Sequence, residues 1–203
     1  MAPILKIDPR RPEPGPLARA VAVLRGGGII AYPTETFYGL GVDAANEGAI
    51  ERLFAVKGRD FSNPVPVVIG SESALEGLAA VVPPLARELA ARYWPGPLTL
   101  LFHAAPFLSR RLTAGSGKIA VRVPDHPVAL LLAGALGTPL TSTSANRSGQ
   151  KECLTAEEVR ERLGEGLDLI LDGGATPGGP GSTILDVTRE PPVVLRHGAI
   201  DYP

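Results

Sequence analysis

The sequence predicts one layered α/β domain with a mixed β-sheet. Helical and strand patterns alternate along the whole chain, which is typical of helices packed in layers on a sheet. Hydrophobic residues make up 44% of the 203 positions and aromatic residues 5%, so we expect a sizeable, mainly aliphatic core. The last two strands, 183–187 and 193–196, are joined by too few residues for a parallel crossover, which makes the sheet mixed. No linker divides residues 1–203, and residues 1–15 are expected to form an extended, Pro-rich lead-in.

Six helices are expected where apolar residues recur every three or four positions. Three consecutive glycines end the first helix, and a Trp-Pro-Gly-Pro run ends the fourth. Asn46, Asp125 and Thr155 are the expected N-caps, and Glu158 completes a capping box with Thr155. The predicted helical segments are 17–24, 47–57, 72–80, 84–93, 126–136 and 156–163.

Strands are expected at short aliphatic runs that are bounded by glycine, proline or polar residues. The run at 119–123 alternates, and Arg122 falls on the face opposite its apolar residues. The segments 33–45 and 172–181 are expected to be loops. The other predicted strands are 29–32, 65–69, 98–103, 140–143, 167–171, 183–187 and 193–196.

The composition excludes several classes of protein. A net charge of −1 gives no sign of a general nucleic-acid or membrane binder. Cys153 is the single cysteine and the three histidines are scattered, so neither an intramolecular disulfide nor a protein-held metal is expected. No apolar run approaches the roughly 20 residues that cross a bilayer, and the N-terminus lacks the apolar stretch of a secretory signal. We therefore expect a cytoplasmic protein with no membrane partner.

Two glycine-containing motifs resemble nucleotide-binding loops but lack the partners that such loops need. Gly39 to Ala44 fits GxGxxG/A after a strand, yet no acidic residue follows about 20 positions later to hold a ribose. Residues 114–118 read like the end of a P-loop, but Leu112 and Ile119 replace its first glycine and its Ser or Thr. Neither a dinucleotide site nor a P-loop is predicted.

Three polar clusters at element ends form the candidate site. Residues 32–41 present hydroxyl groups after a buried strand, and residues 141–149 offer hydroxyls, an amide and a guanidinium after another strand. Residues 57–64 place Lys57 and Arg59 at a helix end. Both cations suit phosphate oxygens, but they equally suit the helix dipole, and each loop alone also reads as a solvated turn.

Further cations stand near the ends of other strands. Arg122, Arg147 and Arg196 would form, with Lys57 and Arg59, a cationic concavity in a chain of net charge −1. That pattern favours an anionic small substrate over a duplex, although each arginine alone is typical of a surface ion pair. No Ser-His-Asp, Cys-His or GxSxG motif is found, so covalent acyl chemistry is not predicted.

At these loops the sequence resembles the YrdC-like family of L-threonylcarbamoyladenylate synthases, in its short, single-domain form. The resemblance covers residues 12–200, and seven motifs in one order are far more specific than any single motif. The paired family signature of K-x-R and S-x-N is matched by Lys57, Arg59, Ser144 and Asn146. The matching stretches are YPTETFYGLG (32–41), KGR with the following SNP (57–64), WPGPLTL (94–100), VRVPDHP (121–127), TSTSANRSG (141–149), STILDV (182–187) and VLRHGAI (194–200).

The resemblance implies a mixed, twisted β-sheet flanked by helices, with the active site on its concave face. It also implies the reaction of L-threonine, bicarbonate and ATP to L-threonylcarbamoyl-AMP and pyrophosphate. The product would feed N6-threonylcarbamoyladenosine synthesis at position 37 of ANN-decoding tRNAs, where a separate transferase complex acts. ATP is expected to arrive with Mg²⁺, without a metal held tightly by the protein.

The chemistry of this reaction suggests roles for eight residues. The threonine carboxylate, the carbamate formed on its amine and the triphosphate must meet, so positioning and charge neutralisation would supply most of the rate. The roles that the resemblance implies are catalysis by Lys57 and Arg59, phosphate binding by Lys57, Arg59 and Arg196, nucleotide binding by Ser144 and Asn146, carboxylate binding by Arg122, and contacts to threonine or its carbamate from Thr34 and Ser182.

Two other functions stay open from the sequence. One is carbamoyl-adenylate formation by a module of the same fold, as in longer hydrogenase-maturation proteins. The other is weak RNA binding on the concave surface, against which the net charge of −1 and the few aromatic residues argue. Asp60 and His197 depart from the family pattern, and no role is assigned to them.

Overall fold

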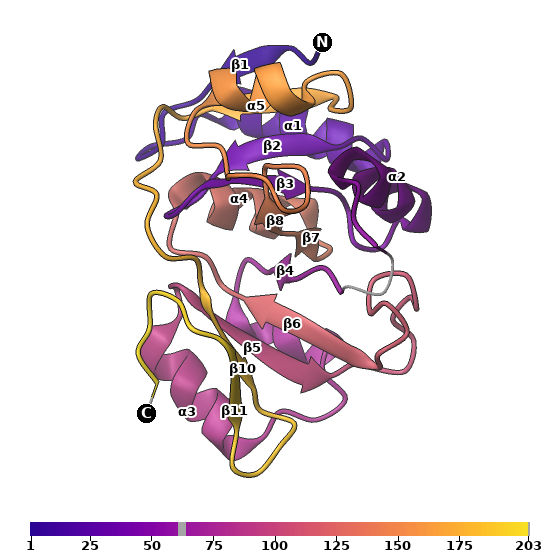
Figure 1. Cartoon of the computed structure of the whole chain (residues 1–203), viewed down its shortest axis with the longest axis vertical. Coiled ribbons are helices and arrows are strands. Elements are labelled where there is room, and N and C mark those ends of the chain that lie inside the picture. The colour runs from indigo at the N-terminus through magenta and orange to yellow at the C-terminus, as the bar shows by residue number, and fades with distance from the viewer. Residues whose placement is uncertain (61–63, 203) are drawn as a thin grey trace.

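The computed structural model describes residues 1–60 and 64–202 and confirms the mixed α/β class, with the strands divided between two sheets (Figure 1). Within those residues, one sheet has five strands in the order β1-β9-β2-β3-β8, and the other has six in the order β11-β10-β5-β6-β4-β7. The first sheet contains β1 (Ile4–Lys6), β2 (Ile30–Pro33), β3 (Tyr38–Gly41), β8 (Thr143–Ser144) and β9 (Leu169–Asp172). The second contains β4 (Val67–Val68), β5 (Leu98–His103), β6 (Lys118–Arg122), β7 (Leu140–Thr141), β10 (Thr183–Asp186) and β11 (Val193–Arg196).

Helices cover both faces of the first sheet. The described residues form five α-helices and one 3-10 helix, not all of which lie on this sheet. They are α1 (Pro14–Arg25), α2 (Glu47–Lys57), α3 (Pro84–Tyr93), α4 (Pro127–Leu136), α5 (Ala156–Leu163) and the 3-10 helix η1 (Glu72–Gly77). Successive side chains of β2 point to opposite faces: Ala31 joins the core formed with α2 and α5, and Ile30 and Tyr32 join the core formed with α1 and α4. The first sheet is therefore buried on both sides, as a largely apolar strand such as β2 requires.

The second sheet is covered on one face by α3, while its other face is open to a cavity. Leu100 and Phe102 of β5 belong to the core that includes α3, so Thr99 and Leu101 point to the opposite face and line the cavity. Neighbouring β6 alternates in the same way and turns Arg122 toward the cavity, which confirms the face predicted for it from the sequence. The sheet thus presents a mixed face to the site, with the polar side chains of Thr99 and Arg122 among apolar ones.

Several elements differ from the sequence prediction. The segment 33–45, expected to be a loop, contains β3, which pairs antiparallel with β2. The strand expected at 65–69 is reduced to β4, and the one expected at 140–143 is divided between β7 and β8, which lie in different sheets. Asp125 does not cap α4, because His126 is the N-cap and its Nδ1 accepts a hydrogen bond from a backbone N–H at 3.2 Å.

Other predicted features are confirmed or extended. Asn46 caps α2 and Thr155 caps α5, each through its side-chain oxygen. The lead-in at 1–15 contains β1, which pairs in parallel with β9, and the first residues of α1. The helix expected at 72–80 is the shorter η1. None of the helices described here is both long enough and apolar enough to span a membrane.

A close approach between two glycines holds α4 against the end of β4. A Cβ on Gly70 would lie 2.6 Å from Cα of Gly134, whereas a Cβ on Gly134 would meet nothing within 4 Å. We expect Gly70→Ala to lower the free energy of unfolding by about 1–3 kcal/mol through overpacking. Gly134→Ala is the matched control and should raise it by roughly 0.5–1 kcal/mol through helix propensity. Urea denaturation measures both, and equal effects would contradict the close packing.

Candidate active site

A cavity of about 610 Å³ opens where the two sheets meet. Its wall comes from the β2–β3 loop, from β4, β5 and β6, and from the segments that follow β7, precede β10 and follow β11. All three polar clusters, at 32–41, 57–64 and 141–149, contribute residues to this wall, although they are far apart in the sequence. The predicted site residues that line it are Thr34, Arg59, Arg122, Ser144, Ser182 and Arg196.

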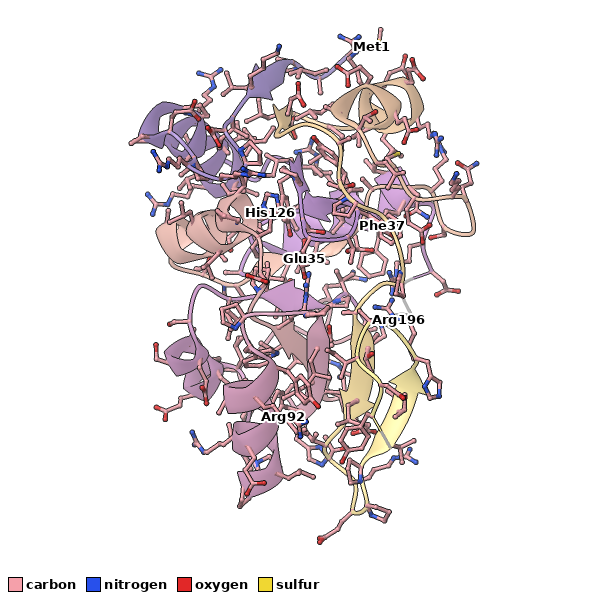
Figure 2. All side chains as sticks on the ribbon, turned by 90° about the vertical axis from the view of Figure 1, so that its left-hand side faces the viewer. Met1, Glu35, Phe37, Arg92, His126 and Arg196 are labelled. Carbon is pink, nitrogen blue, oxygen red and sulfur yellow. The ribbon has the colours of Figure 1, made fainter. Side chains whose placement is uncertain are left out.

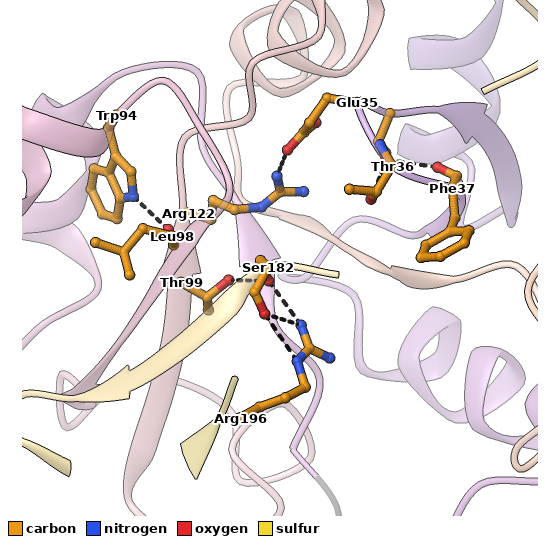
Figure 3. Close-up of polar contacts among 10 residues, drawn as sticks. Glu35, Thr36, Phe37, Trp94, Leu98, Thr99, Arg122, Ser182 and Arg196 are labelled. Carbon is orange, nitrogen blue, oxygen red and sulfur yellow. Dashed lines mark hydrogen bonds and ion pairs between the residues drawn. The ribbon is translucent and has the colours of Figure 1, made fainter. Parts of the chain in front are cut away.

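Arg122, at the end of β6, is buried in the cavity wall with 8% of its surface exposed. Burial lowers the pKa of Arg122 to about 10, so its guanidinium still carries a charge at neutral pH. Nη1 of Arg122 forms an ion pair with Oε1 of Glu35, which lies in the β2–β3 loop (Figure 3). This pair joins the β2–β3 loop of the first sheet to a strand of the second sheet.

Arg196, the last residue of β11, is exposed, lines the cavity and is anchored to the residue before β10. Its Nε and Nη2 donate to the backbone carbonyl of Ser182 at 3.0 and 2.7 Å, and Nη2 also contacts Oγ of Ser182 at 2.9 Å (Figure 3). The Ser182 hydroxyl lies 2.8 Å from that of Thr99 on β5. An exposed guanidinium is thus held next to a hydroxyl pair that faces the cavity.

The β2–β3 loop is shaped by the hydroxyl of Thr34. Oγ1 of Thr34 donates to the carbonyl of Phe37 at 2.6 Å and accepts from the backbone N–H of Thr36 at 3.2 Å. These bonds close the turn that carries Glu35. Figure 3 shows Glu35 pointing toward Arg122. Thr34 therefore lines the cavity and also positions the loop.

Lys57, the last residue of α2, lies behind the cavity wall and does not line the cavity. Its Nζ donates to the carbonyls of Ser144 and Asn146 at 2.6 and 2.9 Å and to Oδ1 of Asn146 at 3.3 Å. The carbonyl of Lys57 accepts from the N–H of Ser148 at 2.9 Å. Burial, with a contribution from the like charge of Arg59, lowers the pKa of Lys57 to about 8. Lys57 supports the S-x-N loop from within.

The S-x-N residues differ in their relation to the cavity. Ser144 lines it, and its Oγ donates to Oδ1 of Asn146 at 2.6 Å. Asn146 is buried and does not line the cavity, and its side chain also donates to the carbonyl of Gln150. Arg147, one residue further, is exposed and is not part of the cavity wall. The loop thus presents Ser144, while Asn146 holds its shape.

Arg59 brings a guanidinium into the cavity from the segment after α2. Its Nη2 donates to the carbonyl of Pro64 at 2.8 Å, and Nη1 lies 3.4 Å from Oγ1 of Thr143. Burial lowers the pKa of Arg59, and Nε is buried with no hydrogen-bond partner among residues 1–60 and 64–202. Residues 61–63 of this predicted cluster lie outside the described residues.

Sequence reasoning missed the part that Glu35 and Glu152 play in the site. Glu35 stands in the first polar cluster, and its pairing with Arg122 brings together residues 87 positions apart, so spacing alone could not reveal it. Glu152 follows the polar cluster at 141–149 and lines the cavity. One signal for Glu35 was available in the sequence. A glutamate in a loop beside a cationic site needs a cation as its partner if the loop is buried.

The comparisons with known proteins point to one family. The family model Sua5_yciO_yrdC, described as "Telomere recombination", matches residues 22–198. A curated protein of Bacillus subtilis named threonylcarbamoyl-AMP synthase is 43% identical over 91% of this chain and 54% of its own length. A Vibrio vulnificus protein of the same name is 38% identical over 90% of this chain and 98% of its own length.

The structural comparison agrees. Sua5 of P. abyssi, solved in complex with L-threonine, superposes with a TM-score of 0.94 and 40% identity over 98% of this chain and 58% of that chain. The chain spans about half the length of the first curated relatives that it matches, since it covers 53% and 54% of them. The matched part contains the complete cavity described above.

Proposed function

The chain belongs to the Sua5/YciO/YrdC family, and from that premise we propose that it is a threonylcarbamoyl-AMP synthase. It would convert L-threonine, bicarbonate and ATP to L-threonylcarbamoyl-AMP and pyrophosphate. The observation that supports this most directly is the set of cations that line one cavity: buried Arg122, half-buried Arg59 and exposed Arg196. One carboxylate and one triphosphate can be neutralised there at the same time.

The reaction needs orientation more than a strong base or a covalent nucleophile. Threonine's amine first takes up the carbon of bicarbonate as a carbamate, with loss of water. A carbamate oxygen then attacks the α-phosphorus, and the bond to pyrophosphate breaks. Because both reactants are anions, fixed cations that hold them in line lower the barrier by positioning and electrostatics.

The residues take separate parts in this scheme. Arg122 holds the threonine carboxylate, Arg59 and Arg196 hold phosphate oxygens, and Ser182 contacts threonine or its carbamate. Lys57 acts as a positioning residue, because its hydrogen bonds to the S-x-N loop set the place of Ser144 beside the nucleotide. Asn146 acts through the same loop, and Thr34 through the turn that it closes. Mg²⁺ would enter on the triphosphate, and the product would pass to a transferase complex that modifies tRNA.

An assay with purified chain, ATP, L-threonine and bicarbonate tests the proposal. We expect pyrophosphate release that requires both L-threonine and bicarbonate, with a nucleotide product one threonylcarbamoyl group heavier than AMP by mass spectrometry. Omission of either co-substrate is the control. Pyrophosphate release that is independent of threonine would refute the synthase function, and carbamoyl-AMP as product would favour the related carbamoyl-adenylate chemistry.

Replacing Arg59 or Arg196 should weaken ATP binding. We expect Arg59→Ala and Arg196→Ala each to raise KM for ATP tenfold or more, because a hydrogen bond to a charged group contributes about 1.5–3 kcal/mol. Arg147→Ala is the matched control, since Arg147 is exposed and does not line the cavity. It should change KM for ATP less than about twofold. Equal effects of all three variants would contradict the assignment.

ATP binding should weaken in mild alkali because of Lys57. Its pKa is lowered to about 8, so Lys57 is a cation below that pH and neutral above it. The loss of one positive charge behind the phosphate site should raise Kd for ATP about tenfold between about pH 7.5 and 9.5. Calorimetry measures this change, and the same titration of Lys57→Met is the control. If Kd for ATP rises by the same factor with pH in Lys57→Met, Lys57 is not the group whose titration weakens ATP binding.

A further inference from the structure

The chain that follows β11 turns back over the segment that leads into β10, and residues 198–200 form a short strap across that segment. The backbone N–H of Ala199 donates to the carbonyl of Gly181 at 2.9 Å. The hydroxyl of Thr183 donates to the carbonyl of Ile200 at 2.6 Å and accepts from the N–H of Ile200 at 3.0 Å. Ile200 also packs against the larger hydrophobic core, so the strap is held on both sides.

Gly198 begins the strap at a point where the two backbones touch. A Cβ on Gly198 would lie 2.2 Å from the carbonyl oxygen of Gly181, 2.5 Å from the carbonyl carbon of Ser182 and 2.6 Å from the backbone nitrogen of Thr183. All three atoms belong to the backbone, so no side chain can rotate to make room. Gly198 does not have a positive φ, so close approach, and not backbone conformation, is what excludes a side chain there.

The backbone that Gly198 touches carries two groups of the cavity wall. The carbonyl of Ser182 accepts from Nε and Nη2 of Arg196 at 3.0 and 2.7 Å, and the Ser182 hydroxyl lies 2.8 Å from that of Thr99 (Figure 3). Figure 2 shows Arg196 close to the level at which the two halves of the molecule meet. Gly198 itself does not line the cavity. A shift of the backbone at Ser182 would therefore move both a hydroxyl and a guanidinium of the site.

We propose that Gly198 is a positioning residue, which sets Ser182 and Arg196 in the cavity wall by letting the strap lie directly against residues 181–183. Because Ile200 is packed on the core, the strap resists outward movement, and an added methyl group would displace the cavity wall instead. The inference rests on the proposed function for the ligands of the two groups, L-threonine at Ser182 and the phosphates of ATP at Arg196. It assigns the placement of both to one glycine outside the cavity.

Calorimetric titration of Gly198→Ala with ATP and, separately, with L-threonine tests the inference. We expect Kd for each ligand to rise about tenfold, because each loses a well-placed polar contact. Gly164→Ala is the matched control: its Cβ would lie 2.4 Å from the carbonyl oxygen of Arg160, a backbone contact of the same kind, and neither residue lines the cavity. It should change both Kd values less than about twofold. Equal changes in the two variants would overturn the inference.

A double variant shows whether Gly198 acts through Arg196. Once Arg196→Ala has removed the guanidinium, adding Gly198→Ala should raise Kd for ATP less than about twofold further, because the group that it displaces is already absent. Kd for L-threonine should still rise about tenfold, since Ser182 is retained. Fully additive effects on ATP binding would contradict a positioning role.

Thr183→Val keeps the test decisive if Gly198→Ala does not fold. Valine removes both hydroxyl bonds to the strap without an added clash, and Thr183 does not line the cavity. We expect Kd for both ligands to rise about threefold in Thr183→Val and to stay near the wild-type values in Thr183→Ser, which retains the hydroxyl. Unchanged Kd values in Thr183→Val would count against the strap.

The pyrophosphate assay separates this inference from the proposed function. If Gly198→Ala binds both ligands more weakly but the wild-type chain releases no threonine-dependent pyrophosphate, the synthase activity is refuted and the role of Gly198 is supported. If the wild-type chain makes the product while Gly198→Ala binds both ligands as tightly as the wild type, the activity is supported and the role of Gly198 is refuted.

Discussion

Replacing Arg122 by methionine is expected to lower kcat/KM for L-threonine by about 1000-fold, because a buried, charge-assisted contact to the substrate carboxylate is lost. KM for ATP should change little, since Arg59 and Arg196 are the cavity-lining cations proposed to hold its phosphates. The pyrophosphate assay, run with each substrate varied in turn, measures both constants. A large effect on ATP and none on threonine would place the carboxylate site elsewhere.

The same substitution should also destabilise the fold, and a double variant separates the two effects. Arg122→Met leaves Glu35 buried without its cation, which costs about 3–5 kcal/mol of unfolding free energy. Adding Glu35→Gln removes the uncompensated charge, so the double variant should recover most of that stability in urea denaturation. Its activity should not recover. Recovery of activity together with stability would mean that Arg122 has only a structural role.

Replacing Lys57 by methionine is expected to have the second-largest effect, with kcat/KM for ATP lowered about 100-fold. The variant removes the donor to three acceptors of the S-x-N loop. The buried carbonyl of Asn146 loses this partner, while the carbonyl of Ser144 keeps the backbone N–H of Asn146 at 3.0 Å. Each unsatisfied buried acceptor costs about 1–3 kcal/mol, so the loop would shift and Ser144 would lose its place in the cavity wall.

Lys151→Met provides the control for this substitution. Lys151 is an exposed lysine just after the same loop, so its replacement should change kcat/KM for ATP less than about twofold. If Lys57→Met impairs only the KM for threonine, or matches Lys151→Met, Lys57 does not position the nucleotide site.

Local features of the fold were predictable because neighbours in the sequence determine them. The helix that ends at Lys57 follows from apolar spacing and the cap at Asn46, whose Oδ1 accepts from the N–H of Ala49 at 3.0 Å. The hairpin of β10 and β11 follows from two apolar runs and a connection too short for a crossover. The face of Arg122 follows from simple alternation on one strand. None of these needed a distant residue.

Other features depended on distant pairing and were missed. β3 has two glycines among its four residues and reads as a loop, but it is stabilised as a strand by β2 on one side and β8 on the other. The partner of Glu35 comes from a strand in the other sheet. The burial of Lys57 depends on a loop that begins 87 residues later, so its hydrogen bonds to that loop could not be predicted from spacing. Its role toward phosphate stays a prediction.

The sequence by itself determined the α/β class, most of the helices, and the set of polar loops whose motifs resemble one enzyme family. Those features rest on periodicity, caps and residue types, which are local. Only the tertiary structure decided which of the polar residues face the cavity, which support it from behind, and that Glu35 holds Arg122. Those outcomes depend on how the two sheets meet at the cavity, because a buried charge there needs a partner that can come from far along the chain.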